Sequence, residues 1–232
     1  MMASHAPRST YDAYRARLEV YFDRTARQNW VDLTSDAKVS GIRATVRAGR
    51  DRMRAMLLDW LPDDLSGKRI LDAGCGTGSL AVAAAQLGAH VTAIDISGGL
   101  VDVARDRAPS GLDIDWRVGD MLDPALGHFD HVVAMDSLIH YETGDIVDVL
   151  AALGARAPSI AFTFAPRTPL LAAMHATGKL FPKSDRAPAI VPVAEAKLTR
   201  LLAQRLPSHG IAASERIVSG FYTSQAMLVS RG

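Results

Sequence analysis

The run ILDAGCGTG, from Ile70 to Gly78, constrains the fold of this chain more than any other stretch. An apolar segment ends in an aspartate and is followed by three glycines at alternate positions. Glycine adopts backbone conformations that other residues avoid, and it lets the main chain approach a ligand closely. A strand, a glycine-rich turn and a helix in this order hold the cofactor in many α/β folds. We therefore expect a cofactor at the carboxyl end of this strand.

Short strand-like runs alternate with helical segments from Lys68 onward. The expected strands cover residues 68–73, 90–95, 114–120, 129–137 and 159–164. This alternation predicts βαβ units, and hence a mostly parallel, doubly wound α/β sheet with helices on both faces. The C-terminal segments 210–220 and 221–230 have no helix between them, so we expect an antiparallel hairpin at a sheet edge.

Two segments fall outside this alternation. Residues 1–60 are expected to form a mostly helical N-terminal cap, and residues 61–232 the main domain. Residues 165–194 interrupt the βα rhythm after the fifth strand, with five prolines around a short apolar patch. Long insertions in compact domains are often lids or binding loops. We expect this one to cover the substrate.

Composition narrows the class of protein. The chain has 232 residues, of which 48% are hydrophobic and 22% charged, as in soluble globular domains. A net charge of +1 gives no reason to expect a nucleic-acid partner. The single cysteine, Cys75, excludes an intramolecular disulfide, and neither a signal-peptide core nor a membrane-spanning apolar run is visible. We expect a cytoplasmic protein and leave contact with a membrane surface open.

The spacing of the glycines discriminates among cofactors. A dinucleotide fingerprint needs Gly-x-Gly-x-x-Gly, but counted from Gly74 the third position is Ser79. No Gly-Lys-Ser/Thr follows, which excludes a phosphate-binding P-loop. Asp95 closes the next strand about 20 residues on, where a ribose diol needs a carboxylate acceptor. Asp120 closes the third strand, so these acids and Asp72 are expected to face one crevice.

The glycine run, the acid that ends VTAID, the Gly-Asp-Met turn and the final hairpin resemble a class I methyltransferase dependent on S-adenosylmethionine (SAM), over residues 65–232. The resemblance implies a Rossmann-like fold and SAM as co-substrate. It places the three glycines beside the methionine part of SAM, Asp95 at the ribose hydroxyls, and Asp120 with Met121 at the adenine. The cofactor residues that it implies are Asp72, Gly74, Cys75, Gly76, Gly78, Asp95, Ile96, Asp120, Met121 and Asp136.

The segments outside this core resemble a narrower family. DSLIHY, residues 136–141, takes the place of the Asn/Asp-Pro-Pro-Tyr/Phe run of base-methylating enzymes, which favours a small-molecule acceptor. Residues 21–33, 42–62 and 162–195 are similar to the magnesium protoporphyrin IX methyltransferases of chlorophyll and bacteriochlorophyll synthesis. FTFAPRTPLL, GKLFP and DRAPAIVP are the specific part. Relatives commonly have Gly-Phe-x-x-Trp where this chain has ARQNW.

That resemblance implies methyl transfer from SAM to a propionate of magnesium protoporphyrin IX, giving the monomethyl ester. A carboxylate with an ordinary pKa near 4 is already ionised at neutral pH, so no general base is required. The enzyme then contributes mainly proximity, alignment and exclusion of water. We expect Tyr21, His140 and Tyr141 to position the attacking carboxylate. No protein-bound metal is expected, because the magnesium belongs to the substrate.

Some alternatives stay open at this stage. Arg43, Arg47, Arg50 and Arg54 are spaced to share one stripe of a helix, which is either a solvated face or a surface that attracts propionates or an acidic partner. The family suggests the large porphyrin-binding subunit of magnesium chelatase as a partner. The rival functions are a SAM-dependent methyltransferase of another small carboxylate or hydroxyl acceptor and a non-catalytic SAM-binding sensor. Ser79 disfavours an NAD-dependent oxidoreductase.

Overall fold

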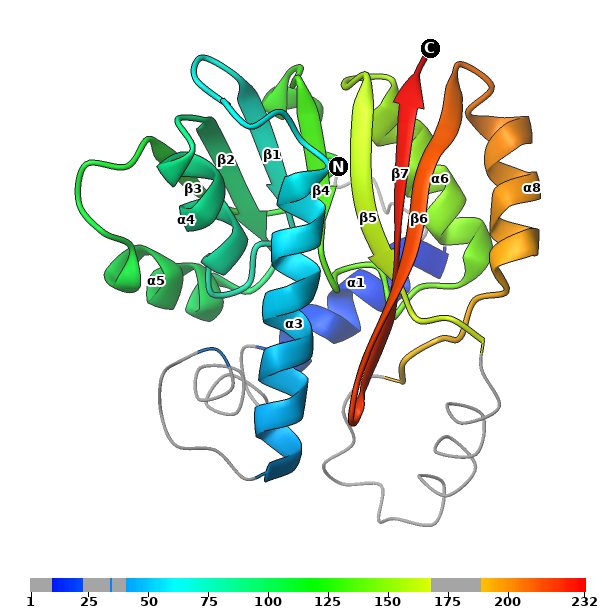
Figure 1. Cartoon of the computed structure of the whole chain (residues 1–232), viewed down its shortest axis with the longest axis horizontal. Helices are drawn as coiled ribbons and strands as arrows, with labels where there is room; N and C mark the ends of the chain where they lie inside the picture. The colour runs from blue at the N-terminus through cyan, green and yellow to red at the C-terminus, as the bar shows by residue number, and fades with distance from the viewer. Residues whose placement is uncertain (1–9, 23–33, 35–40, 168–188) are drawn as a thin grey trace, which may run out of the picture.

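A seven-stranded sheet with the order β3-β2-β1-β4-β5-β7-β6 forms the centre of the computed structural model, which describes residues 10–22, 34, 41–167 and 189–232 (Figure 1). β1 to β5 are parallel, and β7 lies antiparallel between β5 and β6. The strands are β1 (Arg69–Ala73), β2 (His90–Asp95), β3 (Ile114–Val118), β4 (His131–Ala134), β5 (Ser159–Phe164), β6 (His209–Ser219) and β7 (Tyr222–Arg231). The predicted doubly wound sheet with an antiparallel C-terminal hairpin is confirmed.

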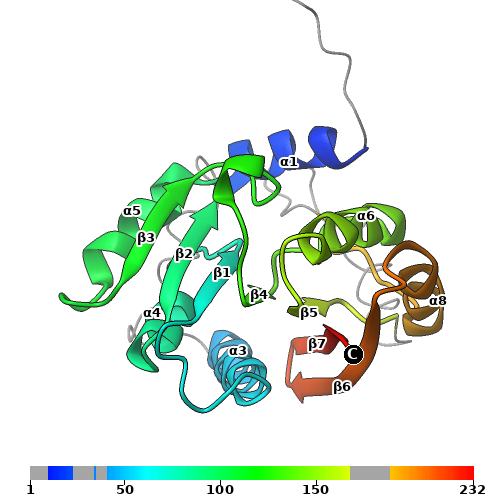
Figure 2. The same ribbon diagram turned by 90° about the horizontal axis from the view of Figure 1, so that it is seen from above.

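Helices cover both faces of this sheet, as Figure 2 shows from above. α3 and α4 pack on one face, and α6 and α8 on the other, so the apolar core is divided into two clusters. α5 covers β2 and β3. Among the described residues the helices are α1 (Thr10–Tyr21), α3 (Gly41–Asp59), α4 (Ser79–Gln86), α5 (Gly98–Arg107), α6 (Thr143–Gly154) and α8 (Glu195–Arg205), with a 3₁₀ turn at Pro124–Leu126. The strand order reverses between β1 and β4, which opens a ligand crevice at their carboxyl ends.

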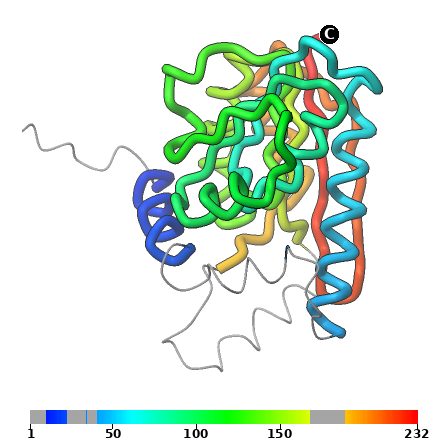
Figure 3. Tube along the Cα trace, turned by 90° about the vertical axis from the view of Figure 1, so that its left-hand side faces the viewer, coloured from blue at the N-terminus to red at the C-terminus, as the bar shows by residue number. Residues whose placement is uncertain are grey.

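Helix α3 runs along the hairpin of β6 and β7 (Figure 3). Gly49, in the middle of α3, allows a close approach, because a Cβ there would lie 2.5 Å from the ring of Tyr222. The Ser219 hydroxyl also donates a hydrogen bond to the Thr45 carbonyl oxygen, at 2.9 Å. These contacts fix the side of α3 that faces the carboxyl ends of the central strands.

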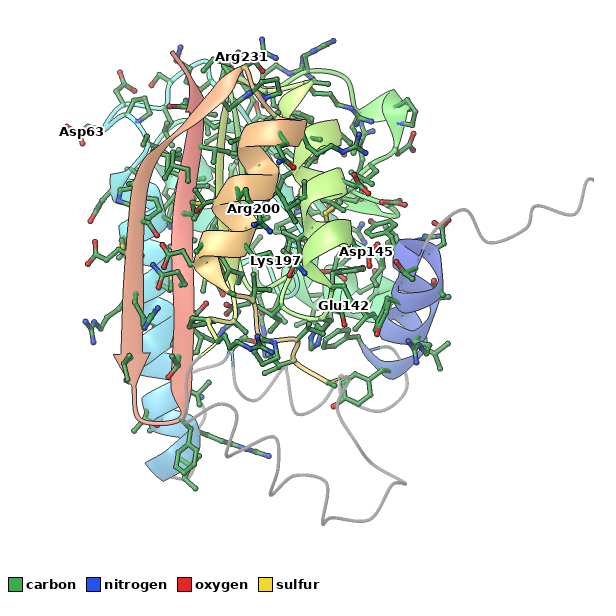
Figure 4. All side chains as sticks on the ribbon, turned by 90° about the vertical axis from the view of Figure 1, so that its right-hand side faces the viewer. Asp63, Glu142, Asp145, Lys197, Arg200 and Arg231 are labelled. Atoms are coloured by element: carbon green, nitrogen blue, oxygen red, sulfur yellow. The ribbon has the colours of Figure 1, made fainter. Side chains whose placement is uncertain are left out.

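Helix α1 is held against residues that follow β3 and β4. The rings of Tyr11 and Tyr141 stack with centroids 5.1 Å apart. The Tyr11 hydroxyl donates to Asp120 Oδ1 at 2.8 Å, and the Thr10 hydroxyl donates to Asp145 Oδ1 at 2.6 Å. Asp145 lies in the first turn of α6, where Figure 4 shows it beside α1. These contacts place α1 at the crevice.

The two ends of the insertion after β5 are fixed close together. The Val193 N–H donates to the Ala165 carbonyl oxygen at 2.8 Å, and the Arg167 N–H donates to the Val193 carbonyl oxygen at 2.9 Å. The Val191 N–H donates to the Ile139 carbonyl oxygen at 2.8 Å, next to the crevice. Residues 168–188 lie outside the described part of the chain, so the substrate-covering role of 165–194 stays a prediction.

No helix within the described ranges is long and apolar enough to cross a membrane.

Candidate active site

A cavity of about 530 Å³ opens at the carboxyl ends of β1, β2 and β4. Its size is in the range of small-molecule sites. Its walls come from the glycine loop after β1, the loop after β4, α3 and α1. All of the predicted site residues except Tyr21 and Asp120 line it, namely Asp72, Gly74, Cys75, Gly76, Gly78, Asp95, Ile96, Met121, Asp136, His140 and Tyr141. The structure therefore brings together predicted residues from four separate parts of the sequence.

The glycine loop needs its glycines. Gly74 and Gly78 have φ angles of 86° and 80°, in the left-handed region that residues with a Cβ rarely adopt. A Cβ on Gly74 would lie 2.3 Å from Ser137 Cβ, and one on Gly78 would lie 2.5 Å from the ring of Trp116. Gly78 is also the residue directly before α4.

Asp95 holds this loop in place while it lines the cavity. Its Oδ2 accepts a hydrogen bond from the Gly76 N–H and its Oδ1 accepts one from the Ser97 N–H, both at 2.9 Å. A carboxylate oxygen has two lone pairs and can accept from more than one donor, including a ligand hydroxyl. Asp95 can therefore shape the glycine loop and receive a ribose diol with the same two atoms.

We predict that Asp95→Ala weakens SAM binding by about 1–3 kcal/mol, because the ribose hydroxyls lose a charged acceptor and Gly76 loses its partner. Isothermal titration with SAM measures the change. Asp113→Ala is the control, because Asp113 is an exposed acid away from the cavity. A folded Asp95→Ala protein with wild-type affinity would remove Asp95 from the site.

Asp72 lies beneath the loop and is almost completely buried, with 1% of its surface exposed. Burial, together with the neighbouring Asp95 carboxylate, raises the pKa of Asp72 to about 7, although a hydrogen bond from the Ala81 N–H lowers it. Among the described residues its Oδ2 has no hydrogen-bond partner, and neither does the Ser137 hydroxyl. Buried polar atoms without partners are rare. They fit a ligand that carries a cationic, hydrogen-bond-donating group, as SAM does.

The raised pKa of Asp72 predicts a pH-dependent stability without ligand. The folded protein keeps this proton up to about pH 7, whereas an unfolded chain releases it near 3.8. The free energy of unfolding therefore falls as pH rises from about 4 to about 7, by up to about 4 kcal/mol. Asp72→Asn has no proton to release, so its Tm relative to wild type should increase between about pH 5 and pH 8. A Tm difference that does not change with pH would contradict this assignment.

Asp120 and Tyr21 lie off the cavity wall. The Asp120 carboxylate accepts hydrogen bonds from the Tyr11 hydroxyl and the Leu122 N–H, so it faces α1, and its contact with adenine stays a prediction. At the C-terminal end of α1 the cavity-lining residues are Leu18, on the helix, and Phe22, directly after it. Because these are four residues apart, they share a helix face from which Tyr21 is rotated by about 100°.

His140 and Tyr141 both line the cavity and are buried. His140 Nδ1 lies 3.3 Å from the Ala189 carbonyl oxygen. A carbonyl oxygen only accepts hydrogen bonds, so Nδ1 carries the proton in this contact. The ring of Phe22 lies against His140, with centroids 6.1 Å apart. Burial raises the pKa of Tyr141, so its hydroxyl stays protonated and can donate.

Asp136 is the centre of a polar network that its sequence position did not indicate. It pairs with Arg50, and its oxygens accept hydrogen bonds from the hydroxyls of Tyr222 and Thr163 at 3.1 and 3.2 Å. A third hydroxyl, of Ser224, lies 3.5 Å from Asp136 Oδ1. The spacing of the arginines on α3 was the one signal for Arg50. Thr163, Tyr222 and Ser224 carried none, because strand pairing alone brings them to this point.

Metal-ligand clusters of three or more His, Cys, Asp or Glu side chains are absent from the described residues.

Comparisons with known proteins match this chain to methyltransferases. Residues 134–231 match the family described as the magnesium-protoporphyrin IX methyltransferase C-terminus, and residues 70–156 match a general methyltransferase domain. The chain is 51% identical over 223 residues to the magnesium-protoporphyrin O-methyltransferase of Rhodobacter capsulatus, covering 94% of this chain and 97% of that protein. It is 29% identical over 214 residues to the Synechocystis enzyme of that name, covering 89% of this chain and 92% of that one.

A solved structure shares the architecture. It is the magnesium protoporphyrin IX methyltransferase of Synechocystis PCC 6803 with bound SAH, the demethylated form of SAM. The TM-score is 0.83 at 28% identity, and the match covers 94% of this chain and 99% of that chain.

Proposed function

The chain belongs to the magnesium-protoporphyrin O-methyltransferase family, and we propose that SAM and a propionate of magnesium protoporphyrin IX meet in its cavity, where the monomethyl ester forms. The observation that carries this proposal is that two loops suited to different ligands line one cavity. The glycine loop with Asp95 is the first, and the loop after β4 with His140 and Tyr141 is the second. A cofactor and an acceptor can therefore be held against each other.

The reaction needs alignment more than acid–base chemistry. An ionised propionate oxygen attacks the methyl carbon of SAM in line with the sulfonium sulfur. An O–C bond forms, the C–S bond breaks, and SAH leaves with no proton to transfer. The glycine loop and Asp95 hold the methyl donor. The buried Tyr141 can donate a hydrogen bond to the acceptor carboxylate, and His140 can donate one from Nε2 as an imidazolium, because its Nδ1–H faces the Ala189 carbonyl oxygen. Their burial also keeps water away from the reacting atoms.

The direct test is turnover. Purified protein is incubated with SAM and magnesium protoporphyrin IX, and the porphyrin is analysed by mass spectrometry. We expect a product heavier by one methyl ester, with SAH formed in equal amount. The dimethyl ester of the same porphyrin is the matched control, since it has no carboxylate to methylate. SAM binding without methylation of any acceptor would favour the sensor, and turnover only with other small carboxylates or with hydroxyl acceptors would favour the other rival.

Three narrower expectations are predictions. The family resemblance implies methylation of the ring C propionate and delivery of the porphyrin by the large subunit of magnesium chelatase. The sequence itself led us to expect a cytoplasmic protein and left peripheral membrane contact open. Co-purification with the chelatase subunit and sedimentation with liposomes test the last two.

A further inference from the structure

We propose that Arg50, held in place by Asp136, is the receptor for a ligand carboxylate in the cavity. The carboxylate is either a propionate of the porphyrin or the α-carboxylate of SAM. The inference rests on the proposed function and deepens it, because the chain would then recognise the group that reacts or the group that anchors the methyl donor. A cavity-lining arginine on α3 would in this way determine which molecules bind.

Packing of α3 against the hairpin does not by itself explain why the Arg50–Asp136 ion pair is buried. The side chains of Arg50 and Asp136 are 19% and 5% exposed, and removing two charges from water to this extent is costly. Apolar and neutral contacts already fasten the helix, through Gly49 against Tyr222 and through the Ser219 hydroxyl. A pair of small apolar residues would fasten it equally well. The charges are better explained by a ligand.

Asp136 is built to hold a guanidinium in one orientation. Its carboxylate accepts hydrogen bonds from two hydroxyls besides pairing with Arg50, and its own N–H donates to Thr163 Oγ1 at 2.7 Å. Its φ angle of 54° is the one left-handed conformation among the described non-glycine residues. Backbone strain of this kind is found preferentially at functional sites. Asp136 thus acts as a positioning residue, which differs from the direct cofactor contact expected from the sequence.

The charge distribution in the cavity favours a carboxylate at this position. Arg47 and Arg54, about one turn of α3 on either side of Arg50, line the same wall. The helix contributes one acid to the cavity, Asp51, which pairs with Arg54 at 2.9 Å, so its arginines outnumber its acids there. The acids Asp72 and Asp95 line the cavity from β1 and β2. A planar guanidinium with five N–H donors matches a carboxylate in two parallel hydrogen bonds, and one Arg50 nitrogen, Nη1, donates to Asp136 Oδ2. Arg50 itself lines the cavity.

The test compares three ligands across matched variants. Binding of SAH, magnesium protoporphyrin IX and its dimethyl ester is measured by titration to wild type, Arg50→Met and Arg50→Lys. Arg52→Met is the control, because Arg52 is exposed on the same helix and away from the cavity. Because Arg50→Met leaves a buried acid without its partner, the double variant Arg50→Met/Asp136→Asn supplies a neutral pair in case the single variant does not fold.

We expect roughly 10–100-fold weaker binding of one carboxylate ligand in Arg50→Met and in the double variant, a smaller loss in Arg50→Lys, and none in Arg52→Met. A loss for the porphyrin diacid but not its dimethyl ester identifies a propionate, and a loss for SAH identifies the α-carboxylate. Unchanged binding of all three ligands, or equal loss for all three, would overturn the proposal. Turnover by wild type is recorded separately, so failure of the proposed function and failure of this inference are distinguishable.

Discussion

Replacement of His140 by alanine is expected to lower kcat by roughly 10–1000-fold and to leave the affinity for SAM nearly unchanged. The ring lines the cavity beside the loop after β4, while the contacts of the cofactor come from the glycine loop and Asp95. An interaction made mainly in the transition state appears in the rate and not in cofactor binding. A residual rate should remain, because an ionised propionate needs no base. Steady-state kinetics and SAM titration measure both quantities.

Two conservative variants separate a role at the substrate from a structural one. In His140→Asn the amide nitrogen replaces Nδ1 and can keep the hydrogen bond to the Ala189 carbonyl oxygen. In His140→Gln the amide nitrogen replaces Nε2, the other ring nitrogen. If the ring positions the carboxylate, His140→Gln should retain more turnover than His140→Asn. The reverse order would show that His140 serves mainly to hold Ala189, and full activity of His140→Ala would pass the positioning role to Tyr141 or Tyr21.

The local pattern of apolar and polar residues was enough to predict most strands of the sheet. The expected strands 90–95 and 159–164 coincide with β2 and β5, because apolar and β-branched residues continue to the point where a charged or turn residue stops them. The expected strand 129–137 is longer than β4, which ends at Ala134. The chain leaves the sheet there because Asp136 takes a left-handed φ. That conformation depends on partners in β5 and β7, and no local pattern contains it.

The candidate site also contains residues that local sequence predicts and residues that only the tertiary structure brings in. The glycine loop and Asp95 could be predicted, since a turn and the next strand end in one βαβ unit are neighbours by topology. The partners of Asp136 and Asp120 could not, because α1, α3, β5 and β7 bring them in from distant parts of the chain. The stripe on α3 indicated several arginines without indicating which one is paired. Tyr21 was placed on the cavity by resemblance, whereas the helical repeat turns Leu18 and Phe22 toward it.

Gly74→Ala is expected to weaken SAM binding by roughly 100-fold or more. A residue with a Cβ in the left-handed region costs about 1–2 kcal/mol, and overpacking adds about 1–3 kcal/mol. Both apply here, since φ is 86° and the new Cβ would lie 2.3 Å from Ser137 Cβ. Gly111→Ala is the matched control, with a φ of 84° and no atom within 4 Å of the new Cβ. It should lose a little stability and no SAM affinity.

The clash can also be relieved from the opposite side. Ser137→Gly removes the atom that the new Cβ would meet, so the double variant Gly74→Ala/Ser137→Gly should recover part of the lost affinity while the backbone strain remains. Ser137 lies on the loop that leads to His140, so displacing it should disturb the acceptor side of the cavity as well. Gly74→Ala is therefore expected to lower kcat together with SAM affinity, in contrast to His140→Ala, which should lower kcat alone. Wild-type affinity and Tm in Gly74→Ala would show that the two loops are not in contact in solution.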